Sequence, residues 1–580
     1  MMNFLQNTFL NVYKKRAYPN YWDLIALFIV LGIIMLLAIQ AKHMSVPYKL
    51  GQPTPISLDP RYLPGYALRT VLRMFIAMLA SLLFTFTIAT WAAKNKKAER
   101  IIIPLIDILQ SVPILGFLSI TVVGFISLFP GSLLGPECAA IFAIFSSQAW
   151  NMALGFYQTV RSVPLELKEA AHVFHLSAWQ RFWRIDVPFS MPGLLWNMMV
   201  SMSSGWFFVV ASEAISVSNQ QILLPGIGSY ITVAIQSSNV FAILYAILTM
   251  FIVILIYDQL LFRPLVAWAD KFKAEQSTDN IETHSWVIDI LHRTRVLRFL
   301  GVKIMQFFNA FVNWPLFRIE HAPHSSDTHS FYLRYISFIL NSFIMIALLA
   351  AIIYSVIFIY QHIPTLSVLH VFLLGLVTAF RVFILVILCS LLWIPVGVWI
   401  GLRPNVANFI QPIAQFLAAF PANVLYPIVV IFIVRYHLNV NIWASPLMIL
   451  GAQWYILFNV IAGASIIPKD LLQAADNLGL KKWLRWRRLI LPSIFPFYIT
   501  GAITASGGAW NASIVAEVVS WGNTKLTATG LGAYISEYTS KGDFLHTALG
   551  IGVMCVIVLI LNRLIWRPLY LIAETHFAET

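Results

Sequence analysis

The feature that most constrains the fold of this chain is an internal repeat. A shift of 304 positions aligns residues 150–264 with residues 454–568 without gaps. It superposes identical residues at many places, among them Trp150 and Trp454, Pro164 and Pro468, Pro188 and Pro492, Trp206 and Trp510, Glu213 and Glu517, Gly226 and Gly530, and Gly228 and Gly532. Upstream, a shift of 308 places Thr70 on Thr378, Arg73 on Arg381 and Pro113 on Pro421. The chain is therefore predicted to fold as two copies of one architecture.

Composition places both copies in a membrane. Hydrophobic residues make up 59% of the 580 residues and charged residues only 11%, which is less than half of the ~25% found in soluble proteins. The mean hydropathy is +0.79. A soluble chain of this length would divide into several domains, each with a charged surface that this composition cannot supply. We therefore predict an all-α polytopic membrane protein.

Twelve runs are predicted as membrane helices, each of which needs about 20 mostly apolar residues. They begin near Leu24, Met74, Ile101, Cys138, Met191 and Val240, and again near Tyr332, Val382, Ile410, Ile442, Ile494 and Phe544. Because six is even, the halves point the same way and are expected to be related by a pseudo-two-fold axis along the membrane normal. This predicts a pathway at the seam; duplication for stability alone is the alternative. Small residues at 203–205 and 507–509 place the fifth run of each half there.

The repeat and the apolar runs divide the chain into five parts. We expect an N-terminal tail, a first membrane helix and an outer loop in 1–65, a first repeat in 66–267, a linker in 268–330, an extra membrane helix in 331–372 and a second repeat in 373–580. In the linker, residues 286–311 combine helical apolar spacing with arginines, which predicts a basic amphipathic helix on the inner leaflet. His321, His324 and His329 follow, either as metal ligands or in a solvated linker.

Orientation follows from the basic residues. They gather in the N-terminal tail at 14–16, in the loop at 94–100 and in a loop after the fourth run of each half, whereas the loops 213–239 and 361–371 contain none. The positive-inside rule therefore places both termini in the cytoplasm. It also accounts for the net charge of +14 without nucleic-acid binding. The three cysteines are far apart, so no metal site and no disulfide framework is expected.

The two basic loops have related sequences. We name residues 161–188 the first polar loop and residues 465–492 the second polar loop; they read RSVPLELKEAAHVFHLSAWQRFWRIDVP and SIIPKDLLQAADNLGLKKWLRWRRLILP. Each predicts a helix, a turn, a second helix, and a proline that begins the next membrane helix. His175 and Gly479 occupy the turn, where a left-handed backbone suits glycine and is tolerated by histidine. Ser177 and Gln180 match a capping box.

The predicted exposed face of each turn carries large apolar side chains among arginines. These residues are Leu176, Trp179 and Phe182 in the first loop, and Leu480, Trp483 and Trp486 in the second. Aromatic side chains ringed by arginine suit an interface with another protein. They equally suit an amphipathic helix that rests on lipid headgroups, and the residues by themselves leave both possibilities open.

The polar loops resemble the signature loop of the membrane subunits of ABC importers, the binding-protein-dependent permeases. That signature is Glu-Ala-Ala, three residues, Gly, nine residues and Ile-x-Leu-Pro. The first loop matches it at Glu169, Ala170, Ala171, Ile185 and Pro188, and departs from it at His175 and Val187. The second loop matches it at Ala474, Ala475, Gly479, Leu491 and Pro492, and departs from it at Gln473 and Leu489. The resemblance covers about 66–267 and 373–573, and it is strongest toward permeases for nitrate, sulfonates and taurine.

The resemblance implies a type I ABC importer fold in the bacterial inner membrane. Two ATPase subunits would bind the cytoplasmic loops, and an extracytoplasmic solute-binding protein would deliver a small anion such as nitrate, a sulfonate or taurine. The implied ATPase contacts are Glu169, Ala170, Ala171, His175, Trp179 and Pro188, with Gln473, Ala474, Ala475, Gly479, Trp483 and Pro492. No cofactor is implied. Because Gln473 lacks the charge of Glu169, the two contacts are expected to be unequal.

Charged residues within membrane-spanning runs are costly and suggest function. Arg73 and Arg381 lie near the outer end of the second run of each half, and Glu213 and Glu517 near the outer end of the fifth. They predict two structural ion pairs, Arg73–Glu213 and Arg381–Glu517. In the alternative, the arginines attract an anionic substrate. Asp107 is a further candidate, and the repeat does not duplicate it.

Other functions fit the sequence less well. A twelve-helix secondary transporter driven by an ion gradient also has two parallel halves, but its usual Gly-x-x-x-Asp-Arg-x-Gly pattern is absent from the loop AAKNKKAER. A channel is a weaker alternative. The chain contains no HExxH, no GxSxG and no Gly-Lys-Ser/Thr phosphate loop. It is therefore not expected to be an enzyme, and ATP hydrolysis is expected on a separate subunit.

Overall fold

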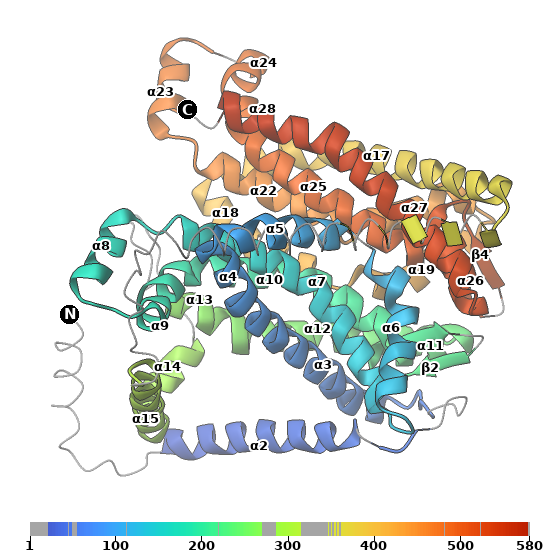
Figure 1. Ribbon diagram of the computed structural model, residues 1–580, viewed down its shortest axis with the longest axis horizontal. Helices are drawn as coiled ribbons and strands as arrows, with labels where there is room; N and C mark the ends of the chain where they lie inside the picture. The colour runs from blue at the N-terminus through green and yellow to red at the C-terminus, as the bar shows by residue number, and fades with distance from the viewer. Residues whose placement is uncertain are drawn as a thin grey trace.

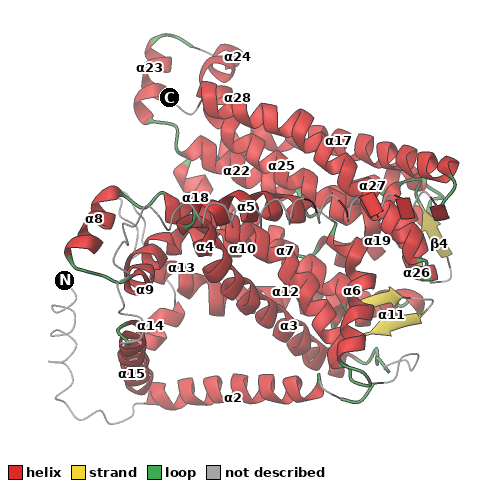
Figure 2. Cartoon of the chain, viewed as in Figure 1, coloured by secondary structure: helices red, strands yellow, loops and turns green. Residues whose placement is uncertain are grey.

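Two bundles of helices lie side by side in the computed structural model, the first drawn in blue to green and the second in yellow to red (Figure 1). The structure describes residues 21–44, 46–48, 55–111, 113–217, 220–269, 286–314, 361–480, 482–522 and 524–577, with isolated positions between 346 and 358. Figure 2 shows the described strands gathered at one end of a molecule that is otherwise helical. This confirms the all-α membrane fold.

The first bundle follows a long apolar helix, α2 (Tyr21–His43). Its elements are η1 (Pro60–Tyr62), α3 (Leu63–Phe84), η2 (Thr85–Ala89), α4 (Thr90–Lys94), α5 (Lys96–Ser111), α6 (Ile114–Leu128), α7 (Leu134–Arg161), α8 (Leu165–Val173), α9 (Ala178–Arg181), η3 (Phe182–Asp186), α10 (Val187–Ser212), β1 (Ala214–Val217), β2 (Gln220–Leu223), α11 (Ile227–Gln236), α12 (Val240–Tyr257), η4 (Asp258–Phe262) and α13 (Arg263–Ala269).

Two linker helices, α14 (Trp286–Arg293) and α15 (Arg295–Val312), precede the second bundle. The elements of that bundle are α17 (Thr365–Gly401), α18 (Pro404–Ala419), η7 (Ala422–Leu425), α19 (Tyr426–Arg435), α20 (Val440–Trp443), α21 (Ser445–Ile449), α22 (Gln453–Ser465), α23 (Lys469–Asn477), α24 (Lys482–Arg485), η8 (Trp486–Ile490), α25 (Leu491–Ala516), β3 (Val518–Trp521), β4 (Thr524–Thr527), α26 (Leu531–Lys541), α27 (Phe544–Leu561), η9 (Asn562–Trp566) and α28 (Arg567–Phe577).

The duplicated sequence gives duplicated local structure. In each bundle a short antiparallel hairpin follows the fifth membrane helix, with Ala214 opposite Leu223 in one and Val518 opposite Thr527 in the other. The sequence analysis did not predict these hairpins. Both occur at equivalent positions of the repeat, which shows that the two copies share more than their helices.

Membrane helices run through four prolines, two of which the sequence predicts as starting points. A π turn precedes each of four X-Pro pairs: η3 before Pro188, η4 before Pro264, η8 before Pro492 and η9 before Pro568. Proline lacks the N–H that would bond to the carbonyl four residues earlier. The wider turn bonds across five residues and carries the helix past that gap. The prediction that Pro188 and Pro492 begin helices is therefore wrong, because Ala178–Ser212 and Trp483–Ala516 are each continuous.

The third predicted run of each half is broken at a proline. Pro113 separates α5 from α6, and Pro421 separates α18 from η7 and α19. Among the described residues, seven helices are long and apolar enough to cross a membrane, or eight if the pair Val440–Ile449 and Gln453–Ser465, bent by 43°, is one span. The count of twelve remains a prediction.

The linker prediction is met in part. Residues 286–312 are helical as expected, although Thr294 divides them into α14 and α15. The run near Tyr332 and the three linker histidines lie outside the described residues. The predicted repeat boundaries at 66 and 373 fall inside α3 and α17, since these helices begin at Leu63 and Thr365.

Candidate functional site: two polar loops, two ion-pair clusters and a cavity at the seam

The two polar loops lie at one end of the molecule, opposite the two hairpins (Figure 1). Each forms a short helix (α8 or α23), a turn, and a second short helix (α9 or α24). His175 has a φ of 46° and Gly479 a φ of 67°, so both adopt the predicted left-handed backbone. Ser177 and Gln180 form the predicted capping box. The helix–turn–helix prediction is confirmed in both repeats.

The signature residues divide into outward and inward positions. Glu169 and Gln473 are exposed on α8 and α23. Two residues further along, Ala171 and Ala475 are each only 3% exposed. The carbonyl oxygen of each alanine accepts a hydrogen bond from the backbone N–H of Leu176 or Leu480, so the turn folds back on the alanine while Glu169 or Gln473 stays exposed.

The apolar side chains that face outward differ from those predicted. In the first loop Phe182 is buried and Trp179 is half-buried, with its ring 5.4 Å from that of Phe311 on α15. Trp483 in the second loop is 70% exposed, as predicted. The sequence analysis missed Phe174 and Leu478, which are 75% and 76% exposed. Each directly precedes the left-handed residue of its turn, and that position was the available signal.

A buried charge cluster joins three helices at the opposite end of the first repeat. Arg73 on α3 donates to Glu213 Oε1 at 2.7 Å and to the two carboxylate oxygens of Glu137 at 2.5 and 2.8 Å. All three side chains are fully buried. Thr70 Oγ1 also donates to Glu213, at 2.6 Å. The structure therefore joins Arg73 to Glu213 and adds Glu137, an isolated acidic residue that the sequence analysis passed over.

The second repeat contains a reduced version of this cluster. Arg381 donates to Glu517 Oε1 at 2.7 Å, and Thr378 donates to the same oxygen at 2.9 Å. Asn441 stands where the first repeat has Glu137, and it accepts a hydrogen bond from the backbone N–H of Thr529 at 2.7 Å. The side chain of Arg381 keeps 11% exposure. One carboxylate therefore neutralises an arginine that is not wholly buried.

The glycines after each hairpin fit against these carboxylates. Gly228 N donates to Glu213 Oε2 at 2.6 Å. A Cβ atom on Gly226 would lie 2.3 Å from the Glu213 carboxylate, and one on Gly530 would lie 2.3 Å from that of Glu517. The GIG and GLG triplets thus allow the backbone to approach the end of the fifth membrane helix. Ion pair and triplet together form one clasp in each repeat.

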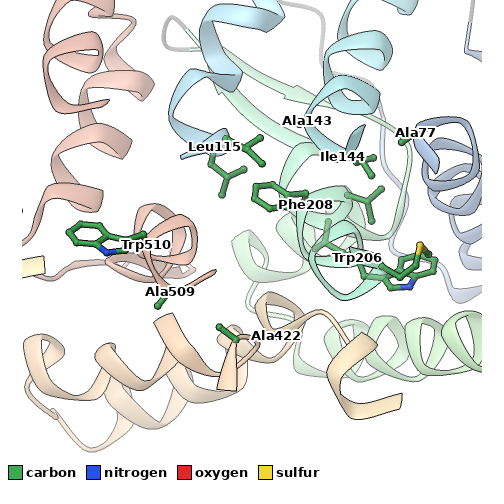
Figure 3. Packing of buried hydrophobic residues seen from close by; sticks show 14 of the residues in the cluster. Ala77, Leu115, Ala143, Ile144, Trp206, Phe208, Ala422, Ala509 and Trp510 are labelled. Atoms are coloured by element: carbon green, nitrogen blue, oxygen red, sulfur yellow. The ribbon is translucent and has the colours of Figure 1, made fainter. Parts of the chain in front are cut away.

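A cavity of about 230 Å³ lies at the seam between the repeats. Helices α7 and α10 line it from the first repeat, and α22 and α25 from the second. Figure 3 shows the surrounding apolar packing, with Ala509 and Trp510 on one side, Phe208 and Trp206 on the other and Ala422 between them. The fifth membrane helices therefore both lie at the seam, as predicted, on opposite sides of the cavity.

Small residues of the fifth helices pack in two directions. Ser203 Oγ on α10 donates to the carbonyl oxygen of Ala418 in the second repeat. A Cβ atom on Gly205 would instead lie 2.4 Å from Met74 Cε in its own repeat. The small residues therefore allow close packing within a repeat as well as across the seam.

The cavity lining is mostly apolar, and its polar groups carry no charge. Serine, threonine, asparagine and glutamine side chains alternate with aromatic rings, and the described lining contains no Asp, Glu, Lys, Arg or His. Ser146 Oγ is buried beside the cavity and makes no hydrogen bond within the described ranges. Arg73 and Arg381 do not line this cavity, and the alternative in which the arginines attract an anionic substrate stays a prediction. The Asp107 side chain lies outside the described residues.

In the described part of the chain, no three His, Cys, Asp or Glu side chains lie close enough together to hold a metal ion.

Comparison with known proteins identifies the unit that is repeated. The model of the family described as "Binding-protein-dependent transport system inner membrane component" matches residues 81–263 and 393–567, which together exceed half of the chain. Each match covers one bundle and includes its polar loop. The comparison thus finds independently the two copies that the internal alignment predicts.

Three individual relatives are each less than 30% identical to this chain over the aligned residues. The chain is 27% identical over 177 residues to the bicarbonate transport system permease protein CmpB of Synechocystis, covering 30% of this chain and 60% of the relative. It is 26% identical over 186 residues to the taurine transport system permease protein TauC of Escherichia coli, covering 31% and 62%. It is 25% identical over 185 residues to the nitrate import permease protein NrtB of Leptolyngbya laminosa, covering 32% and 63%.

In each case the alignment spans about three fifths of the relative, so these relatives share the core unit. The double match of the family model is the broader finding, because it extends over both bundles. The chain belongs to the family of binding-protein-dependent transport system inner membrane components, and it contains two copies of that family's unit.

Proposed function

We propose that this chain forms the transmembrane pathway of an ATP-driven importer, with one ATPase subunit bound to each polar loop. The observation that carries the proposal is the continuity between the loops and the cavity. The second short helix of the first polar loop is part of the 35-residue helix Ala178–Ser212, and that of the second loop is part of the 34-residue helix Trp483–Ala516. Both long helices line the cavity further along.

A continuous helix connects each polar loop directly to the wall of the cavity. A force applied at α9 or α24 reaches the cavity wall through an unbroken helix, because the π turns replace what would otherwise be proline breaks. When ATP draws two ATPase subunits together, the loops bound to them approach each other. The two repeats then rock about the seam and change the side on which the cavity opens.

The exposed part of each loop suits such a contact. Glu169 offers a charge and Phe174 an apolar side chain in the first loop, and Gln473 and Leu478 take these places in the second. An aromatic or aliphatic side chain beside a polar group is the pattern of a small docking surface. The first contact includes a charge that the second lacks, so we propose two ATPase contacts of unequal strength.

The substrate that best fits the site is a small anion delivered by an extracytoplasmic binding protein. The relatives named above are permeases for bicarbonate, taurine and nitrate. Hydroxyl and amide groups in an uncharged cavity donate hydrogen bonds to an anion without a fixed counter-charge that would retain it. Weak binding of this kind suits a pathway, since a transported solute must leave as readily as it enters.

ATP-dependent uptake in proteoliposomes tests this proposal. The chain is purified with the ATPase and binding protein encoded beside it, and uptake of radiolabelled nitrate, bicarbonate and taurine is measured with and without ATP. Glu169→Gln is expected to lower the ATP-dependent rate roughly tenfold, the scale of one charged hydrogen bond. Gln473→Ala is expected to lower it less. Glu166→Gln, on the same exposed helix but outside the signature, is the matched control.

Two results would count against the proposal. Uptake driven by an ion gradient in the absence of ATP would favour a secondary transporter. Equal losses at Glu169 and Gln473 would show that the two loops contact their ATPases equally.

A further inference from the structure

The linker between the repeats is bound to one polar loop. Asn313, which follows the last residue of α15, accepts hydrogen bonds through Oδ1 from Gln180 Nε2 at 3.1 Å and from Arg184 at 2.8 Å. Both donors lie on the second helix of the first polar loop. These contacts join two segments that are more than a hundred residues apart in the chain.

Aromatic rings extend the same contact. Phe311 lies 5.4 Å from Trp179 and Phe308 lies 5.3 Å from Trp183, measured between ring centroids, and both pairs are edge to face. Paired rings in this geometry add stability beyond the area that they bury. The C-terminal part of α15 is therefore a docked element.

The second polar loop lacks the residues that contact α15 in the first polar loop. At the position of Gln180 it has Leu484, which is 47% exposed. At the position of Trp183 it has Arg487, which is also exposed. The residues that receive α15 are thus confined to the first loop.

The apolar face of α15 extends beyond the loop. Phe308 and Phe311 share one helical face with Ile304 and Phe307, since these residues follow the i, i+3, i+4, i+7 spacing. Ile304 is 68% exposed and Phe307 is 74% exposed. About half of an otherwise docked face therefore has no covering within the described part of the chain.

Its surroundings indicate what covers this face. Figure 1 shows α15 beside the start of α2, at the end of the molecule where the first polar loop lies. Helix α2 is apolar along most of its 23 residues and has exposed Leu24 and Phe28 near the same end. Because 23 mostly apolar residues are long enough to span a bilayer, a helix beside the end of α2 lies near the membrane surface.

The basic residues of the linker helices also favour contact with a membrane surface. Helices α14 and α15 contain Arg293, Arg295, Arg298 and Lys303, against a single acidic residue, Asp289. A helix with an apolar face and basic side chains binds at the headgroup level of membranes that contain anionic lipid.

We propose that α15 is a membrane-surface strut: Ile304 and Phe307 insert at the headgroup level of an anionic bilayer, and Phe308, Phe311 and Asn313 hold the first polar loop. The lipid contact stands on the geometry of α15 alone. Its consequence, that the lipid surface positions one of the two ATPase contacts, rests on the proposed function.

Fluorescence quenching in nanodiscs tests the lipid contact without any ATPase. Single cysteines replace Ile304, Phe307 or Gln306 in the full chain, with the three native cysteines changed to serine, and each carries the same fluorophore. Nanodiscs contain phosphatidylcholine with about a third phosphatidylglycerol, and lipid-borne nitroxide is the quencher. Labels at 304 and 307 are expected to be quenched roughly threefold more than the label at 306, on the opposite face. Equal quenching at all three positions would overturn the proposal.

Amide hydrogen exchange of the cysteine-intact chain tests the strut. Exchange in the first polar loop is expected to slow roughly threefold when phosphatidylglycerol is present, with the second loop unchanged as the internal control. Phe307→Glu is expected to abolish that difference, and unchanged exchange in α10 shows that this variant is folded. An equal response of both loops, or none in either, would show that α15 does not connect lipid to the first loop.

Discussion

The first and second polar loops have the same local fold and differ in how they are held. In the first loop, Asp186 pairs with Lys94 at 2.5 Å, and the Lys94 ammonium also lies over the ring of Phe182. Helix α15 holds the same segment from the other side. The second loop has an internal ion pair instead, between Asp476 and Arg485. Among the described residues, an ion pair and hydrogen bonds join the first loop to the rest of the molecule, whereas the ion pair of the second loop lies within that loop.

The same difference extends along the two repeats. At the end that carries the loops, Glu99 pairs with Arg161 and accepts a hydrogen bond from Tyr157 at 2.6 Å. In the second repeat, Ala407 and Ile461 occupy the places of Glu99 and Tyr157, within a small apolar cluster. At the opposite end, Arg73 has two carboxylate partners where Arg381 has one. At these places the first repeat therefore has polar contacts that the second repeat lacks, so its polar loop is held more firmly.

The largest effect is expected from the buried arginines. Arg73→Met leaves Glu137 and Glu213 buried without their partner, and it should lower the free energy of unfolding by about 3–5 kcal/mol. Arg381→Met strands a single carboxylate at a partly exposed site and should have roughly half that effect. Denaturant unfolding of both variants in the same micelle measures the difference. Equal losses would show that Glu137 adds nothing to the first cluster.

An intermediate effect is expected at the brace of the first loop. Asp186→Asn removes a charged partner from Lys94 and should lower the opening free energy of the first loop by about 1–3 kcal/mol, as measured by amide exchange. Asp476→Asn is the matched control in the second loop, where the aspartate is 62% exposed and the pair should contribute about 0–1 kcal/mol. High salt should remove the smaller effect and retain most of the larger one. The comparison fails if Asp476→Asn has the larger effect.

Features that repeat in the sequence were predicted well. Matched opposite charges on the second and fifth runs indicated the pairs of Arg73 and Arg381, and a glycine opposite a histidine indicated both turns. Some features that one repeat has alone were missed. Glu137 has Asn441 as its counterpart, so alignment of the halves gave it no support. The docking of Asn313 on the first loop depends on packing between distant segments, which helical periodicity does not report.

Prolines show a second limit of the sequence. Four X-Pro pairs were compatible with breaks, but the chain passes each of them through a π turn, because bonds across five residues bridge the missing N–H. Pro113 and Pro421 do interrupt their helices. The X-Pro dipeptide by itself therefore does not distinguish a helix that continues from one that is interrupted. The proposed mechanism needs continuous helices to transmit movement from the polar loops to the cavity. That continuity was visible only in the structure.

The smallest effect is expected at the turns, where the loops have different residues in one backbone conformation. Gly479→Ala adds a Cβ at a φ of 67° with no neighbouring atom within 4 Å, so only backbone strain opposes it, and the second loop should lose about 1 kcal/mol. His175→Gly relieves similar strain in the first loop but also increases the freedom of the unfolded chain, so its net effect should be below about 0.5 kcal/mol. Amide exchange of each loop measures both. If Gly479→Ala were neutral, the second loop would not depend on a left-handed turn. Its backbone would then be less constrained than that of the first loop.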